Sequence, residues 1–110
     1  YQGLADGRRV TLADGTELAT SEELTGPAFV AFPPAAVTLH RERPHGSARN
    51  VWKLEIAGLD LHGDQVRADL AGALPMAADL TPAAAAELDL ATGTSVWASV
   101  KAVQTHAYPA

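Results

Sequence analysis

The chain has 110 residues, a formal net charge of −5 and no cysteine. This length suits one compact domain or two small lobes, and the acidic balance disfavours a general nucleic-acid surface, which needs clustered lysine and arginine. The absence of cysteine excludes disulfides and thiolate metal sites, and no apolar run approaches the roughly 20 residues of a membrane-spanning helix. No signal peptide is visible. Because the sequence begins with Tyr1 rather than Met, we expect a piece of a longer protein or a processed product.

The first part of the chain has the short alternating runs and turn residues that are typical of β-strands. A hairpin is expected around Ala13-Asp14-Gly15, because Asp-Gly between two short strands is a strong turn signal. Two more strands are expected over residues 27–32 and 36–41. The composition changes at residues 43–46, so we predict a division into residues 1–44 and residues 45–110.

The second part of the chain alternates over longer stretches. Four strands are expected, over residues 50–57, 65–70, 74–80 and 95–106. Thr81 followed by Pro82 is a natural N-cap with proline at the first helical position, which predicts one short helix over residues 83–88. Many short strands and one short helix predict an all-β fold, a small β-barrel with an N-terminal strand extension, because a barrel removes exposed edges.

The last predicted strand has two distinct faces. Its core face is expected to hold Val96, Ala98, Val100 and Ala102. Its outer face is expected to hold Trp97, Ser99, Lys101 and Val103. A partner subunit or the segment from Ser47 to Asn50 could pack on that outer face.

Hydrogen-bond donors gather at the two ends of this second part. If the strand opened by Ser47-Ala48-Arg49-Asn50 met the last strand, where Lys101-Ala102 lies, a hydroxyl, a guanidinium, an amide and an ammonium would converge. Such donors suit a tetrahedral oxyanion better than a metal or an apolar ligand. Backbone N–H groups of Arg49 and Ala102 would add donors, and Thr81 lies at a helix N-terminus, where the local dipole favours anions. The alternative is that Arg49 and Lys101 are solvated strand residues and that the Ser47–Asn50 segment organises a turn.

Metal binding, ligand stacking and catalysis have weaker support in the sequence. The four histidines are interpreted as surface or loop residues, because no pair has the compact spacing of a zinc or iron site: His40, His45, His62 and His106. Trp52 and Trp97 are interpreted as buried anchors or a subunit contact. A nucleophile elbow, a phosphate loop and a paired acid–base cluster are all absent from the sequence, so we predict that this chain is not an enzyme and holds no metal.

Residues 47–108 resemble the molybdate/tungstate-binding Mop domain. The landmarks in chain order are Ser47-Ala48-Arg49-Asn50, the turn at Gly63, Ala78-Asp79-Leu80-Thr81, Leu88-Asp89-Leu90 with Gly93, and Val96 through Ala102. The preceding residues 26–39 resemble the TOBE regions that follow the ATPase domain of ABC importers. Together the two segments resemble the C-terminal accessory domain of a molybdate ABC transporter ATP-binding subunit.

This resemblance implies an OB-like β-barrel of the Mop/TOBE type, with a TOBE-like segment over residues 1–44 and a Mop-like barrel over residues 45–110. It implies a non-catalytic module for regulation and dimerisation that senses molybdate or tungstate. The oxyanion-binding residues would be Ser47, Arg49, Asn50, Thr81, Lys101 and Ala102. No other cofactor is expected in this part, and ATP would bind only in an upstream ATPase domain.

The expected partners follow from the same resemblance. They are a second copy of the chain in a homodimer, the upstream ATPase domain and the membrane permease subunits, without nucleic acid and without direct membrane insertion. The location would be cytoplasmic, at the inner face of the cell membrane through the transporter complex. The main alternative is a free-standing, molbindin-like storage protein for molybdate or tungstate, which would resemble residues 47–108 alone. An OB-like nucleic-acid binder is a third hypothesis, which the acidic charge disfavours.

Overall fold

A computed structural model describes residues 1–46 and 49–110, with Arg49 described by its backbone alone. Within these residues, eight strands form two antiparallel sheets, and one short α-helix is present. The chain divides into two compact units, each of which is discontinuous in sequence. The terminal unit holds Tyr1–Phe32, Arg49 with Asn50, and Val100–Ala110. The central unit holds Pro33–Gly46 and Val51–Ser99.

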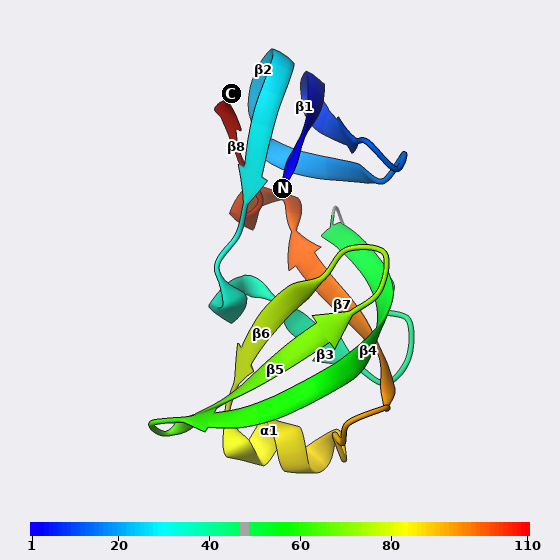
Figure 1. The fold of residues 1–110 in the computed structure, drawn as a ribbon, viewed down its shortest axis with the longest axis vertical. Coiled ribbons are helices and arrows are strands. Elements are labelled where there is room, and N and C mark those ends of the chain that lie inside the picture. The colour runs from blue at the N-terminus through cyan, green and yellow to red at the C-terminus, as the bar shows by residue number, and fades with distance from the viewer. Residues whose placement is uncertain (47–48) are drawn as a thin grey trace. The chain divides into compact units, whose positions relative to one another are not determined.

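The terminal unit is built on a three-stranded sheet (Figure 1). Its strands are β1 (Gln2–Leu12), β2 (Glu17–Ala31) and β8 (His106–Pro109), in the order β1–β2–β8. The predicted hairpin joins β1 to β2: Gly15 has a φ of +90°, and the Asp14 carboxylate accepts a hydrogen bond from the N–H of Thr16 at 2.9 Å. The Asp-Gly turn prediction is therefore confirmed.

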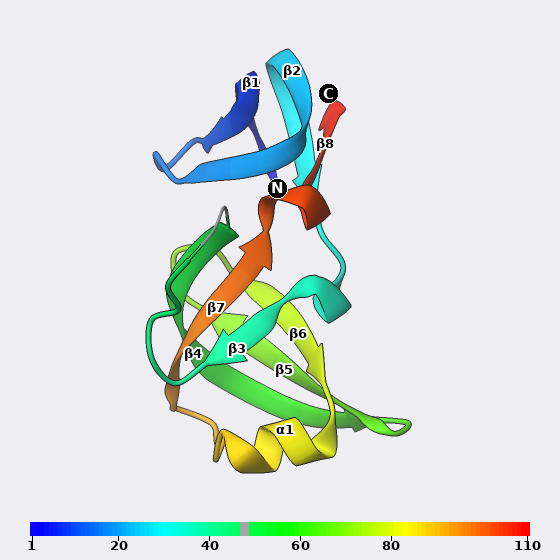
Figure 2. The same ribbon diagram turned by 180° about the vertical axis from the view of Figure 1, so that it is seen from behind.

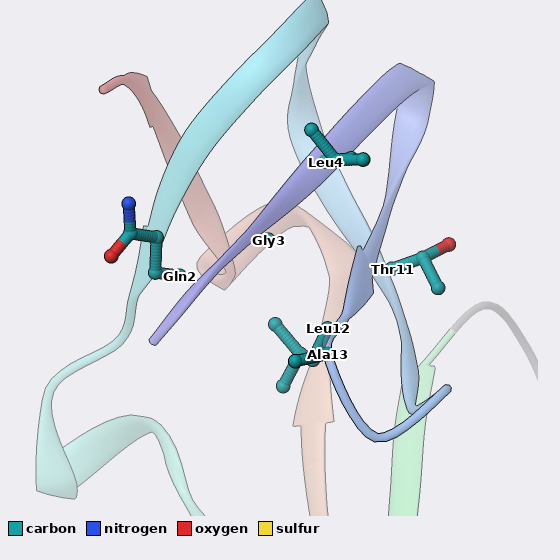
Figure 3. A pocket seen from close by; sticks show the side chains of 6 residues that line it. All are labelled: Gln2, Gly3, Leu4, Thr11, Leu12 and Ala13. Atoms are coloured by element: carbon teal, nitrogen blue, oxygen red, sulfur yellow. The ribbon is translucent and has the colours of Figure 1, made fainter.

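Strand β1 bends so that its two halves pair with different parts of β2. The register shifts between Gly7 and Arg9, and Gly7 has a φ of +69°, which favours glycine. The bend brings Gly3 against the backbone of Thr11, where a β-carbon would clash with the Thr11 carbonyl. The bend leaves an open hollow of about 600 Å³. Figure 3 shows the six residues that line it, from Gln2 to Leu4 and from Thr11 to Ala13, none of which is charged.

The central unit is built on a five-stranded sheet in the order β3–β7–β4–β5–β6 (Figure 2). Its elements are the 3₁₀ turn η1 (Pro34–Ala36), β3 (Thr38–His40), β4 (Arg49–His62), β5 (Gln65–Ala71), β6 (Met76–Leu80), α1 (Pro82–Glu87) and β7 (Ser95–Lys101). The two edge strands, β3 and β6, contact each other, and η1 packs on β6. The sheet therefore curls into a small barrel, in agreement with the predicted all-β fold.

The core is made of small and medium aliphatic side chains from alternate strand positions. Those of the central unit are Ala36, Val37, Leu39, Leu54, Ile56, Ala68, Leu70, Leu74, Ala78, Val96 and Ala98. Those of the terminal unit are Ala5, Val10, Leu18, Ala28, Val30, Val100 and Ala107. The alternation predicted for β4, β5 and the first half of the last strand is confirmed by this burial.

The prediction of one last strand over residues 95–106 is wrong. Strand β7 ends at Lys101, a 3₁₀ turn η2 (Ala102–Gln104) follows, and β8 then pairs with β2 in the other sheet. The predicted faces are wrong at their far end for the same reason, because Ala102 and Val103 lie in η2 and not in the strand. Ser99, predicted on the outer face, is buried, and a hydrogen bond of 2.8 Å with Nε2 of His40 satisfies its hydroxyl there.

The sequence also predicts a helix over residues 83–88 and a division at residue 44. The predicted helix agrees with α1 to within one residue, with Thr81 as its N-cap. The compact units cross the division predicted at residue 44, because β8 joins the strands of the first segment. The division into residues 1–44 and 45–110 stays a prediction about sequence segments. Of the residues described, none belongs to a helix long and apolar enough to cross a membrane.

Candidate functional site

The carboxamide of Asn50 joins the start of β4 to β2. Its Oδ1 accepts a hydrogen bond from the N–H of Ala19 at 2.8 Å, and its Nδ2 donates to the Ala19 carbonyl at 2.9 Å. Next along the same edge of β2, the N–H of Ser21 donates to the Thr105 carbonyl at 2.9 Å. The Asn50 side chain therefore takes the place of a neighbouring strand at Ala19, and it is only 8% exposed.

The same carboxamide holds the turn that follows β7, which we call the Lys101–Thr105 turn. Nδ2 of Asn50 donates to the Thr105 hydroxyl at 3.1 Å, and this hydroxyl donates to the Lys101 carbonyl at 3.0 Å. The Thr105 N–H donates to the Ala102 carbonyl at 3.1 Å, and Thr105 is completely buried. The start of β4 and the end of β7 therefore lie side by side, and buried hydrogen bonds fix the backbone there.

The ammonium group of Lys101 stands on this fixed backbone. The residue is exposed, and its side chain forms no ion pair or hydrogen bond with any residue that the structure describes. A lysine whose main chain is held and whose charge is uncompensated is suited to contact an anion from solvent.

The other predicted site residues have different positions. Ser47 lies outside the described residues, and Arg49 is described only as the first residue of β4. Thr81 belongs to the central unit, where its hydroxyl accepts a hydrogen bond from the N–H of Ala84 at 3.1 Å. Both donor hydrogens of the Asn50 amide are used by Ala19 and Thr105, so this side chain positions the Lys101–Thr105 turn.

Sequence reasoning missed Thr105, which connects Asn50 to Lys101. The sequence pattern predicts Thr105 within a continuous strand, where a threonine is ordinary. Its partner Asn50 is 55 positions away in the chain, so no local pattern signals the contact.

A second polar cluster joins β2 to β8. The Glu22 carboxylate accepts a hydrogen bond from the Ala107 N–H at 2.7 Å and lies 2.9 Å from Nδ1 of His106. The Ser21 hydroxyl lies 3.1 Å from the same Nδ1. A catalytic triad needs the acid and the hydroxyl on opposite ring nitrogens, so this Ser–His–Glu group lacks the geometry for nucleophilic catalysis. It instead clamps β8 to β2.

The clamp makes the stability of the protein sensitive to acid. The hydrogen bond with His106, with further ones from Ala107 and Ser21, lowers the pKa of Glu22 from 4.5 to about 2. A carboxylate whose pKa is lower in the folded than in the unfolded protein stabilises the folded protein at pH values above its unfolded pKa of 4.5. This stabilisation is lost as the pH falls from 4.5 to about 2. We expect the thermal midpoint of Glu22→Gln to fall less than that of the wild type across this range, as measured by circular dichroism. Glu23→Gln, at an exposed neighbouring carboxylate, should keep the wild-type profile, and equal acid sensitivity of all three proteins would contradict the assignment.

A smaller hollow lies in the central unit between η1, β3, β6 and α1. Its volume is about 230 Å³, and its lining includes Thr38, Asp79 and Ala84 among aliphatic side chains. Two hydrogen bonds of 2.8 and 2.9 Å from Arg67 lower the pKa of Asp79 and keep this carboxylate charged. A carboxylate in the lining disfavours an anionic ligand, so the hollow is a poor oxyanion site.

Metal binding has no support among the residues that are described. Within that part of the chain, no three histidine, aspartate or glutamate side chains are grouped closely enough to hold a metal ion. The exposed Lys101 ammonium is a group of the kind that binds anions.

The fold of this chain is similar to that of a solved molybdate-binding protein. A crystal structure of the cytoplasmic molybdate-binding protein ModG, with molybdate bound, superposes with a TM-score of 0.88. The superposition covers 100% of this chain and 94% of that one, at 20% sequence identity. The predicted OB-like β-barrel fold is confirmed by this likeness, which concerns the fold alone.

Sequence comparison identifies the family. The chain belongs to the TOBE domain family, whose sequence pattern matches residues 46–107. It is 44% identical over 87 residues to the molybdenum import ATP-binding protein ModC of Mycobacterium tuberculosis, covering 76% of this chain and 24% of that protein. It is 31% identical over 109 residues to the molybdate/tungstate import ATP-binding protein WtpC of Pyrococcus horikoshii, covering 98% of this chain and 31% of that protein. The chain therefore spans less than a third of the length of these relatives.

Proposed function

We propose that this chain is the accessory domain of the ATP-binding subunit of a molybdate importer and that it senses molybdate or tungstate. Its similarity to ModC and WtpC, both named as import ATP-binding proteins, supports this role. The observation that carries the ligand part is the exposed Lys101 side chain, which has no partner among the described residues, on a backbone that Asn50 and Thr105 hold in place.

The proposed site binds a tetrahedral dianion through one point charge and several neutral donors. Lys101 supplies the ammonium, and the backbone N–H of Ala102 lies at the start of the same turn. Ser47 and Arg49 are further proposed contacts, through a hydroxyl and a backbone N–H. Thr81, at the N-terminus of α1 in the central unit, stays a proposed oxyanion contact by its own hydroxyl. Charge-assisted hydrogen bonds to an anion are roughly twice as strong as neutral ones, so Lys101 is the dominant contact. Asn50 acts indirectly, by holding the Lys101–Thr105 turn.

The partners and location follow from the proposed parent subunit. ATP binds in an ATPase domain upstream in the same polypeptide, and this part performs no catalysis. The parent works as a homodimer with membrane permease subunits at the cytoplasmic face of the membrane. The genomic reading frame tests this directly, because an importer ATPase must carry a Walker A motif upstream of the present residues. A frame without that motif would favour the storage protein, an alternative that the fold shared with ModG supports.

Calorimetry tests the ligand. We expect molybdate and tungstate to give saturable binding heats with the isolated chain, because both are tetrahedral dianions of similar size. Perchlorate, a tetrahedral monoanion, should bind much more weakly, since it carries half the charge for Lys101 to neutralise. Absence of saturable heat with molybdate and tungstate would refute the sensing role, and equal binding of perchlorate would show that charge is not recognised.

A further inference from the structure

Two cations gather on one indole ring in the central unit. The guanidinium carbon of Arg43 lies 5.0 Å from the centroid of the Trp97 ring, and the Lys53 ammonium lies 5.9 Å from it. The three residues come from the loop after β3, from β4 and from β7. On β3, His40 is the cross-strand partner of Trp97. We call Arg43, Lys53 and Trp97 the indole–cation surface.

Among the described residues, no carboxylate forms an ion pair with these cations. The chain has 13 acidic and 8 basic residues, yet neither Arg43 nor Lys53 forms an ion pair with any residue within the described ranges. Glu55 lies two positions from Lys53 on the same strand face, but no ion pair joins these two side chains. The Glu55 carboxylate lies near Gly93, with Oε1 3.9 Å from the position that a β-carbon would take there. Each cation is attracted to the ring face, and two like charges near one ring repel each other, so a bound anion would relieve that repulsion. Both side chains are exposed, so an anionic group from solvent can reach them.

We propose that the indole–cation surface binds an acidic segment of a protein partner. Glutamate or aspartate carboxylates of that segment bond to the guanidinium and to the ammonium, and a neighbouring apolar side chain packs on the half-buried indole. Arginine is suited to this role because its planar fork matches a carboxylate. The surface lies wholly in the central unit, and the inference does not depend on the proposed oxyanion site.

The composition of the surface favours an acidic peptide over other anions. A free inorganic oxyanion has no apolar part to cover the indole. A single-stranded nucleic acid would stack on Trp97, but such binding needs a basic groove that follows several phosphates, and this chain has a net charge of −5. A peptide that combines carboxylates with aliphatic side chains uses both the cations and the ring.

The test is a titration followed by NMR, with the Trp97 indole N–H as the reporter, assigned through Trp97→Phe. The probe is a blocked pentapeptide of alternating glutamate and leucine, and its matched control replaces each glutamate by glutamine. We expect a saturable shift of the Trp97 signal with the glutamate peptide only. Arg43→Gln and Lys53→Gln should each weaken binding by about threefold to tenfold, as for an accessible charge pair with hydrogen bonding. Arg8→Gln, which removes one exposed charge from the terminal unit, should leave the affinity unchanged.

Each other outcome overturns the inference. No saturable shift at millimolar glutamate peptide, or equal weakening by Arg8→Gln, would mean that the surface has no specific affinity for carboxylates. Tighter binding of sulfate or of a thymidine oligonucleotide at Trp97 would assign the surface to those ligands instead. Loss of thermal stability in Arg43→Gln and Lys53→Gln without loss of peptide affinity would make the cluster purely structural. Because molybdate binding is proposed at Lys101, Arg43→Gln should leave molybdate calorimetry unchanged, so the two proposals fail separately.

Discussion

Replacing Asn50 with alanine should lower the free energy of unfolding by about 3 kcal/mol. The substitution removes three hydrogen bonds and leaves the Ala19 backbone and the Thr105 hydroxyl without these partners. A typical hydrogen bond contributes about 1 kcal/mol, and unsatisfied buried groups add a further cost. Urea unfolding followed by circular dichroism measures the change.

The matched control for Asn50→Ala is Gln104→Ala. Gln104 carries the same functional group, but it is exposed in η2, and its substitution should change stability by less than about 0.5 kcal/mol. Thr105→Val keeps the side-chain shape and removes only the hydroxyl, so a double-mutant cycle with Asn50→Ala measures the Asn50–Thr105 bond itself. If Asn50→Ala were as mild as Gln104→Ala, the carboxamide would not be the link between β2, β4 and the Lys101–Thr105 turn.

Replacing Lys101 with alanine should reduce molybdate affinity by about tenfold to a hundredfold. The lost charge-assisted hydrogen bond is worth about 1.5–3 kcal/mol, which corresponds to that range of dissociation constants. Stability should change by less than about 0.5 kcal/mol, because the side chain is exposed and the core face of β7 is untouched. Calorimetry and urea unfolding of the same variant measure both quantities.

Two variants separate the role of Lys101 from a general effect of charge. Lys101→Arg retains the cation and should recover most of the affinity. Lys53→Ala removes the other lysine of the chain, on β4, and should leave molybdate binding unchanged. Unaltered affinity in Lys101→Ala would remove this residue from the site. A parallel loss of stability and affinity would make its role structural.

The double variant of Asn50→Ala and Lys101→Ala tests whether Asn50 contacts the oxyanion or only positions Lys101. If Asn50 holds the Lys101–Thr105 turn, Asn50→Ala weakens molybdate binding only while Lys101 is present to be positioned. The two substitutions should then be non-additive in affinity, while their effects on stability add. Additive losses in affinity would indicate that Asn50 contacts the oxyanion directly, as the sequence resemblance implies.

Local sequence determined the features that depend on neighbouring residues. Asp14-Gly15 specifies the β1–β2 turn because glycine readily adopts a positive φ and the aspartate accepts from the Thr16 N–H. Thr81 and Pro82 specify the start of α1 through a capping hydroxyl and a preset φ. Alternation predicted that β4 and β5 each have two distinct faces, because a strand presents successive side chains to opposite faces.

Tertiary structure alone decided the end of the last strand and the use of the polar groups near it. The apolar alternation continues past Lys101, yet the chain turns there because Thr105 bonds back to Lys101 and Ala102, and because β8 pairs with β2. The sequence predicts that the Asn50 amide is free to donate to a ligand. In the structure, this amide donates its hydrogen bonds to Ala19 and Thr105, which lie 31 and 55 positions away in the chain. The gathering of Arg43 and Lys53 at Trp97 is equally invisible in the sequence. The residue types and their order therefore determined the family, the barrel and the candidate residues, whereas contacts between distant segments decided which polar groups are occupied and which face solvent.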